Sequence, residues 1–173
     1  SYLLVLKRHC RVSSTRETIL AVITLLQNTS TRIDTLVEKL RARGHRITPQ
    51  RLAILQVLIA SETHPSVDQV YNEVKAAFPT TSLATVYKTV SIVKAMGEAL
   101  ELQFSQSSNR YDGKKPYPHP HVICTQCHKI IDYESVEIDA MMAKIKQATG
   151  FKLENHRLDF YGICTTCQKH QTS

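Results

Sequence analysis

The chain has 173 residues, a net charge of +7 and 42% hydrophobic residues, which allows one large domain or two small ones with a modest core. No apolar run reaches the roughly 20 residues of a membrane-spanning helix, and no small-residue cleavage site follows the apolar segment near the N-terminus. We therefore expect a cytoplasmic protein without a membrane partner, and the positive charge favours a polyanionic partner.

Residues 1–30 give the weakest signals, and we expect an N-terminal extension there. Its apolar positions lack a clean period, so the pattern predicts only one helix, over residues 18–26. Cys10 has no partner by spacing. The roles of Cys10 and of the whole extension stay open.

Residues 31–112 predict a bundle of short helices. Apolar residues recur with helical spacing from Ile33 to Leu40, and Gly44 ends that helix. Thr48 with Pro49 starts a second helix, and Ser66 with Gln69 forms a capping box that starts a third. Pro79 ends the third helix. The expected core positions of the second and third helices are Leu52, Leu55, Leu58, Ile59, Val67, Val70, Tyr71, Val74 and Phe78.

A fourth helix and a hairpin complete this region. Ser82 caps the helix, its apolar stripe runs from Leu83 through Val86, Val90 and Val93, and it ends near Gly97. The residues expected away from that stripe, where they can reach base edges or phosphates, are Thr85, Tyr87, Lys88 and Thr89. Residues 100–104 and 110–112 predict two strands joined by a polar turn.

Helices followed by a hairpin indicate a winged-helix DNA-binding domain over residues 31–112. A basic cluster with no acidic residue among its members fits that reading: Lys39, Arg41, Arg43, Arg46 and Arg51. A small helical bundle with no nucleic-acid role and a generic solvated basic face are the alternatives.

Residues 113–118 look like a linker, and residues 119–173 predict a small α/β domain. Strands are expected over 121–124 and 129–133, and a helix capped by Ser135 extends to about residue 149 and ends at Gly150. One or two further strands are expected within residues 151–163. The predicted fold class is therefore α+β, with a winged helix followed by a smaller α/β unit.

Four cysteines form two CxxC pairs in the C-terminal domain, Cys124 with Cys127 and Cys164 with Cys167. Each pair has the spacing of half a tetrahedral thiolate site, which suits structural Zn²⁺. Two disulfides or a redox-active pair are the alternatives, and a cytoplasmic protein favours the metal.

A second metal centre is indicated just before the first cysteine pair. His119 and His121 are two residues apart, and in an extended chain such residues face the same side. Asp132 on the neighbouring strand, Asp112 at the end of the hairpin and His64 between two helices can complete the site. Imidazoles and carboxylates together suit Fe²⁺, Mn²⁺ or Zn²⁺. A loop histidine, a turn aspartate and a surface carboxylate are the ordinary readings of these three residues.

The sequence resembles the ferric uptake regulator family of metal-dependent repressors. The resemblance covers residues 32–168 in unbroken order. Its motifs are Arg46-Ile47-Thr48-Pro49-Gln50-Arg51, His64-Pro65, Ala84-Thr85-Val86-Tyr87, Arg110-Tyr111-Asp112, His119-x-His121, Cys124-x-x-Cys127, Lys129-Ile130-Ile131-Asp132-Tyr133, His156-Arg157-Leu158 and Tyr161-Gly162-x-Cys164-x-x-Cys167.

This resemblance implies a non-enzymatic homodimer that binds a palindromic operator in double-stranded DNA. Residues 119–173 would form the dimerisation domain, with zinc on the four cysteines. The regulatory Fe²⁺ or Mn²⁺ would be held by His64, Asp112, His119, His121 and Asp132. The helix with Tyr87 would read the major groove, and the implied DNA contacts are Arg46, Arg51, Thr85, Tyr87 and Lys88. Glu154 and His156 could contribute to an additional metal site.

Within the family, Asp132 and Asp112 resemble the peroxide-sensing branch, in which Fe²⁺ leads to oxidation of a ligand histidine, here His64 or His119, and DNA is released. The iron-uptake branch usually has a glutamate in place of Asp132 and a histidine-rich run in place of His119-Pro120-His121. Pro120 and the leader of 30 residues depart from the family pattern. The alternatives are an iron- or zinc-uptake regulator without peroxide sensing, a small metallohydrolase, and a zinc-stabilised interaction module.

Overall fold

The computed structural model describes residues 15–104, 108–134 and 137–171. The chain divides into two compact units, residues 1–47 and residues 48–173. The described part of the first unit is one long helix, α1, from Thr15 to Ala42, and the turn that follows it. Both candidate metal clusters lie in the second unit, which holds every other helix and strand of the described residues.

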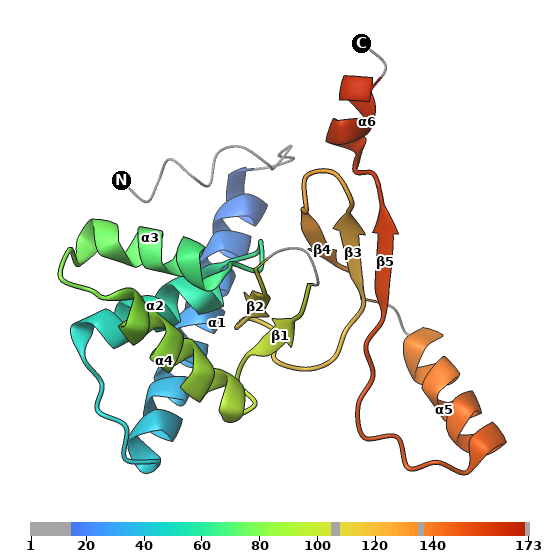
Figure 1. Cartoon of the computed structure of the whole chain (residues 1–173), viewed down its shortest axis with the longest axis horizontal. Helices are drawn as coiled ribbons and strands as arrows, with labels where there is room; N and C mark the ends of the chain where they lie inside the picture. Colours follow the sequence, from blue (N-terminus) through green and yellow to red (C-terminus); the bar gives the residue numbers. More distant parts are fainter. Residues whose placement is uncertain (1–14, 105–107, 135–136, 172–173) are drawn as a thin grey trace. The chain divides into compact units, whose positions relative to one another are not determined.

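Helix α1 corrects one prediction, because residues 18–26 and the helix near Ile33 belong to the same element (Figure 1). No glycine or proline interrupts residues 15–42. The hydroxyl groups of Thr31 and Thr35 donate to the carbonyl oxygens of Gln27 and Thr31 at 2.9 and 2.8 Å, so both hydroxyls find their partners within the helix. The boundary expected after residue 30 falls within this helix. Its predicted C-terminus is confirmed, since Gly44 follows with a φ of 77°.

Three helices of the second unit pack against one another: α2 (Pro49–Ala60), α3 (Val67–Ala77) and α4 (Leu83–Ala95). Their starts follow the predicted caps, because Thr48, Ser66 and Ser82 each accept a hydrogen bond from a backbone N–H of the first turn. Ser66 and Gln69 form the full capping box. The core between the helices contains Ile54, Leu55, Leu58, Val70, Val74, Val86, Val90 and Val93. The predicted core residues Leu52, Tyr71 and Phe78 are only half-buried.

Helix α4 differs from its predicted pattern at two positions. Thr89 was expected on the outer face, but it is buried, and its hydroxyl donates to the carbonyl oxygen of Thr85 at 2.8 Å. That bond satisfies the hydroxyl, so the methyl group can enter the core. Leu83, expected in the apolar stripe, is 37% exposed at the start of the helix.

Strands β1 (Leu100–Leu102) and β2 (Arg110–Asp112) form the predicted antiparallel hairpin; residues 105–107 of its turn lie outside the described residues. The Glu101 carboxylate accepts hydrogen bonds from Lys94 of α4 at 2.8 Å, Asn109 at 3.0 Å and Tyr111 at 2.9 Å. Burial alone would raise the pKa of Glu101, but these bonds lower it to about 2. Glu101 therefore fixes the hairpin to α4.

The C-terminal part contains a three-stranded sheet in the order β4-β3-β5. Strand β3 (His121–Cys124) pairs antiparallel with β4 (Ile130–Asp132) and parallel with β5 (Asp159–Gly162). Helix α5 (Glu137–Thr149) separates β4 from β5 in the chain, and its predicted cap Ser135 lies outside the described residues. The sequence did not predict helix α6 (Thr165–Gln171) after β5.

The elements together give the expected fold class, a winged helix followed by a small α/β unit. The division by a linker at residues 113–118 stays a prediction. Within the described residues, none of the helices combines the length and the apolar character needed to cross a membrane.

Candidate metal centres

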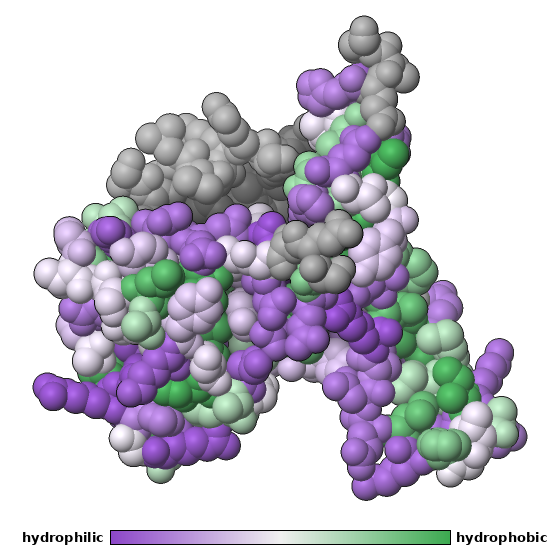
Figure 2. Space-filling view, viewed as in Figure 1, coloured by the Kyte–Doolittle hydropathy of each residue, from purple (hydrophilic) through white to green (hydrophobic). Residues whose placement is uncertain are grey.

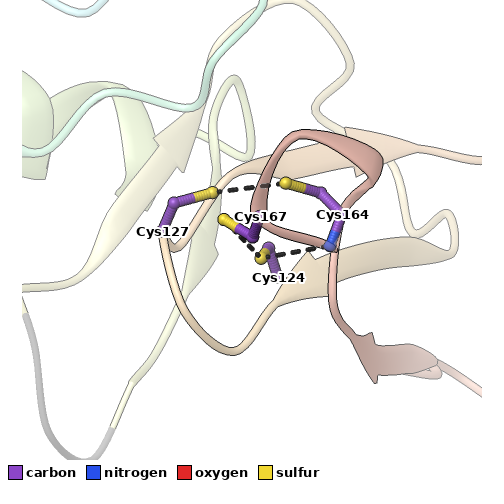
Figure 3. Close-up of side chains that lie close together, drawn as sticks. All are labelled: Cys124, Cys127, Cys164 and Cys167. Atoms are coloured by element: carbon purple, nitrogen blue, oxygen red, sulfur yellow. Dashed lines mark hydrogen bonds between the residues drawn. The ribbon is translucent and has the colours of Figure 1, made fainter. Parts of the chain in front are cut away.

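The four cysteine side chains of the two CxxC pairs meet in one cluster (Figure 3). Cys124 ends β3, and Cys127 lies in the turn between β3 and β4. Cys164 directly precedes α6, and Cys167 lies within its first turn. The sulfur atoms of Cys124 and Cys167 are 3.9 Å apart, and those of Cys127 and Cys164 are 3.7 Å apart. Zinc–sulfur bonds of about 2.3 Å in a tetrahedron place neighbouring sulfur atoms about 3.8 Å apart, so this cluster fits a tetrahedral ion.

Local geometry favours the thiolate form of Cys124. The backbone N–H groups of Cys127 and Cys164 point at its sulfur, the latter at 3.3 Å, and they lower the pKa of the Cys124 thiol to about 6. None of the four cysteines forms a disulfide. The side chain of Cys164 raises the pKa of the Cys167 thiol to about 12, so a bound metal would have to displace that proton. The turn of Cys127 and the start of α6 therefore present four sulfur ligands suited to a soft divalent metal.

The second cluster brings together His64, Asp112, His119, His121 and Asp132. His64 precedes α3, Asp112 ends β2, His119 lies just before β3, and His121 and Asp132 are paired across β3 and β4. Each residue offers one ligand atom, and these five atoms lie within 4.8 Å of one another. Two ligand atoms on opposite sides of an ion, each with a bond of about 2.1 Å, are about 4.2 Å apart. The five side chains would therefore need to move inward by only a few tenths of an ångström to coordinate one ion.

The carboxylates face the imidazoles with one oxygen each. Asp132 Oδ1 is 2.8 Å from His64 Nε2, 3.3 Å from His119 Nε2 and 3.9 Å from His121 Nε2. Asp112 Oδ2 is 3.4 Å from Nε2 of both His64 and His119. Each side chain can therefore give one donor atom. Together the five residues offer three nitrogens and two oxygens, a donor set that suits Fe²⁺, Mn²⁺ or Zn²⁺.

All five donor atoms are buried, and none forms a hydrogen bond of acceptable geometry, although His64 Nε2 and Asp132 Oδ1 are 2.8 Å apart. Burying so many polar atoms is costly unless something binds them, and a cation at the centre would satisfy all of them at once. Burial alone would lower the pKa of His64, but Asp112 and Asp132 outweigh it and raise that pKa to about 9. Burial raises and the imidazoles lower the pKa of Asp132, with a net decrease. These residues fit a divalent cation.

Other groups hold these ligands from behind. Asp112 Oδ1 accepts the backbone N–H groups of Lys114 and Lys115 at 2.8 and 2.9 Å, which leaves Oδ2 for the site. The Lys115 ammonium is 3.2 Å from Asp132 Oδ2 and 2.6 Å from Glu134. Segment 113–115 thus orients both carboxylates so that one oxygen of each points inward.

His64 is held in an unusual backbone conformation, with a φ of 51°. A histidine tolerates this region better than most residues, but the surroundings must maintain it. Arg110 of β2 donates to the His64 carbonyl at 3.3 Å and to Gln69 at 2.6 Å, and the Tyr111 N–H donates to the Pro65 carbonyl at 3.0 Å. The hairpin therefore fixes the loop that carries His64.

The sequence analysis did not identify two residues at this site, Lys115 and Asp159. Asp159 begins β5 and is paired with His121 in the parallel register, with Oδ1 3.5 Å from His121 Nδ1. Its position in a predicted strand was the available signal, but the pairing partner of that strand could not be derived from the chain order. Lys115 gave no signal beyond its place in the linker.

The residues expected to contact DNA lie on three elements. On α4, Tyr87 is 49% exposed, Lys88 is exposed, and Thr85 is half-buried with its hydroxyl 2.8 Å from Ser82 Oγ. Arg46 is exposed in the segment after α1, and Arg51 is half-buried in the first turn of α2. Their contact with DNA remains a prediction.

The additional metal site suggested for Glu154 and His156 gains no support from the described residues. Neither residue belongs to a group of three or more possible ligands there. Glu154 is exposed and lies 3.8 Å from Lys152, and His156 is half-buried.

Comparison with known proteins agrees with this architecture. The sequence profile of the ferric uptake regulator family matches residues 42–161. The peroxide-responsive repressor PerR of Staphylococcus saprophyticus subsp. saprophyticus is 42% identical over 132 residues, which cover 76% of this chain and 88% of that protein.

Two solved structures are similar to the chain. The Helicobacter pylori ferric uptake regulator Fur, whose structure reveals three functional metal binding sites, gives a TM-score of 0.71 at 26% identity and covers 81% of this chain and 93% of its own. The ferric uptake regulator of Francisella tularensis, solved with iron, gives 0.63 at 28% identity and covers 72% of this chain and 96% of its own.

Proposed function

Because the chain belongs to the ferric uptake regulator family, we propose that it is a metal-dependent transcriptional repressor that senses hydrogen peroxide and then releases DNA. The similarity to a peroxide-responsive repressor supports the peroxide response. The observation that carries the proposal is the buried cluster of three imidazoles and two carboxylates, all with donor atoms lacking hydrogen bonds.

The Cys124, Cys127, Cys164 and Cys167 cluster would hold structural Zn²⁺. Sulfur distances of 3.7 and 3.9 Å support a tetrahedral ion, and thiolates are the ligands that zinc prefers in closed structural sites. The cluster ties β3 to α6, two elements far apart in the chain. Zinc would therefore hold the end of the sheet together.

The regulatory ion would be Fe²⁺ or Mn²⁺ bound by His64, Asp112, His119, His121 and Asp132. Fe²⁺ held by these residues would supply the redox chemistry through which hydrogen peroxide oxidises a neighbouring imidazole, with one peroxide oxygen added to the ring and the other released as water. Mn²⁺ would not supply this chemistry. His64 and His119 are the imidazoles proposed as targets. Loss of either one would remove a donor that joins the helical part to the sheet.

The physical basis of the switch is the origin of the five ligands. His64 comes from the loop between α2 and α3, Asp112 from the hairpin, and the other three from the sheet or the segment leading into it. An ion bound to all of them favours one arrangement of these elements. If that arrangement also fits DNA, metal and DNA bind with positive coupling. The DNA contacts proposed are Arg46, Arg51, Thr85, Tyr87 and Lys88.

The protein is proposed to act as a homodimer on a palindromic duplex. Val122, Ile131 and Phe160 are neighbours across the sheet and are 39, 49 and 49% exposed. No described residue of α5 is buried, and Figure 2 shows hydrophobic residues reaching the surface over the C-terminal elements. Such an apolar surface favours association with a second copy of the chain.

The test uses the full-length protein loaded anaerobically with Fe²⁺ or with Mn²⁺. Each form is mixed with a palindromic duplex selected from a random pool by the Mn²⁺-loaded protein. We expect hydrogen peroxide to abolish DNA binding of the Fe²⁺ form only, and mass spectrometry to find one added oxygen atom on the peptide of His64 or His119. Equal loss of DNA binding in both forms, without oxidised histidine, would reject the proposed sensing reaction.

An iron-uptake regulator without peroxide sensing is the second candidate, because two ferric uptake regulators share the fold at 26 and 28% identity. It predicts metal-dependent DNA binding that peroxide leaves intact in the Fe²⁺ form. The same experiment therefore separates the two candidates.

A further inference from the structure

The three histidines of the second cluster differ in what lies behind their rings, and Nδ1 of His64 is buried without a hydrogen-bond partner. A histidine that binds a metal through Nε2 carries its proton on Nδ1, and a hydrogen-bond acceptor at Nδ1 fixes both the tautomer and the ring orientation. For His119 this acceptor is the carbonyl oxygen of Tyr117, 2.8 Å from Nδ1. His119 is therefore oriented by its own backbone segment.

For His121 the group behind the ring is the carboxylate of Asp159. The parallel pairing of β3 and β5 places the two residues side by side, with His121 Nδ1 3.5 Å from Asp159 Oδ1. The His121 and Asp159 side chains are 1 and 7% exposed. Both atoms are buried and lack a hydrogen-bond partner. A shift of a few tenths of an ångström would form this bond and satisfy both.

Asp159 is itself held in place. Its other oxygen, Oδ2, is 2.6 Å from Arg157 Nε and 3.5 Å from the Tyr161 hydroxyl. Arg157 also donates to the Gln103 carbonyl at 3.0 Å, just beyond β1. The carboxylate is thus anchored on one oxygen, and the oxygen that remains points at His121. Asp159 is not one of the five clustered ligand residues, because it faces the opposite edge of the ring.

We propose that Asp159 is a positioning residue of the regulatory metal centre, which accepts the Nδ1 proton of His121 and thereby presents Nε2 to the ion. The inference rests on the proposed function, since it assumes that His121 binds the metal. The carboxylate raises the basicity of the imidazole and adds negative charge near a cation. Both effects strengthen binding of a divalent metal.

The test compares Asp159→Asn with the wild-type full-length protein, each containing zinc. The asparagine keeps the shape but loses the charge and the pair with Arg157. We expect Mn²⁺ affinity, measured by titration with electron paramagnetic resonance, to fall about 10- to 100-fold. In the Co²⁺-loaded protein the exchangeable imidazole N–H signal of His121 should exchange faster with solvent. The matched control is Asp34→Asn, an exposed aspartate of α1 whose loss should change neither quantity.

Zinc content and melting temperature distinguish a positioning role from a structural one, and we expect both to stay close to wild type. If Asp159→Asn fails to fold, Arg157→Gln decides, because it frees the Asp159 carboxylate and should also lower Mn²⁺ affinity. Wild-type Mn²⁺ affinity with an unchanged Co²⁺ spectrum in the folded variant would overturn the inference alone. Absence of Mn²⁺ binding in the wild-type protein would overturn the proposed function and the inference with it.

Discussion

Replacing Cys124 with serine is expected to remove zinc from the cysteine cluster and to unfold the C-terminal sheet. Among the described residues beyond 118, the buried aliphatic side chains are Ile123 and Ile130, and none of α5 is buried. Burying one such side chain contributes about 1.5–3 kcal/mol. Zinc in a small structural site contributes about 10–16 kcal/mol. Zinc binding would therefore contribute more to the stability of this part than its apolar core does. Without the metal, we expect the sheet to unfold.

The assay measures zinc per chain by elemental analysis and unfolding by circular dichroism. We expect Cys124→Ser to lose zinc and to show a smaller, earlier transition, while the helices α2–α4 keep their signal. Cys10→Ser is the matched control, because Cys10 is the one cysteine outside the two CxxC pairs. A Cys124→Ser protein with full zinc content and the wild-type melting curve would refute the reasoning.

Three further predictions concern other parts of the protein. Gly113→Ala should destabilise the fold by about 1–3 kcal/mol in urea unfolding, because a Cβ there would lie 2.8 Å from Leu58 Cγ. The control Gly162→Ala places its Cβ in open space and should change the stability little. Equal destabilisation by the two variants would contradict this prediction. Asp132→Glu should keep Mn²⁺-dependent DNA binding but weaken the peroxide response of the Fe²⁺ form, because the longer side chain can bring a second oxygen to the ion; an unchanged response would remove the reason for choosing the peroxide-sensing branch. Phe160→Lys should shift the protein towards the monomer in light scattering, because it places a charge in the exposed row of the sheet, while Leu83→Lys on α4 should not; a persistent Phe160→Lys dimer would exclude this surface.

Local signals explain why much of the fold was predictable. The caps at Thr48, Ser66 and Ser82 act within one helical turn, so residue spacing alone indicates where α2, α3 and α4 begin. Alternation of apolar residues likewise predicts the first strand of the hairpin, at residues 100–104. The cysteine cluster contains the residues that the CxxC spacing predicts, and the second cluster contains the five residues that the family resemblance implies.

The missed features depend on contacts that chain order does not determine. The burial of Thr89 depends on how α4 packs against the other helices and on the hydrogen bond from its hydroxyl to the Thr85 carbonyl, which replaces a bond to water. The role inferred for Asp159 depends on the parallel pairing of β5 with β3, and nothing in the sequence specifies that partner or register. The continuity of α1 could not be predicted because residues 28–32 include asparagine, serine and threonine, which have low intrinsic helix propensity, although the stretch is helical in the structure.

The central claim is that one ion binds the five clustered residues from the helical part and the sheet at the same time. Anomalous diffraction at the manganese edge from crystals of the Mn²⁺-loaded protein tests it most directly. We expect a manganese peak bonded to His64, Asp112, His119, His121 and Asp132. A peak bonded to the sheet residues alone, with His64 and Asp112 far from it while the protein still binds DNA, would contradict the account.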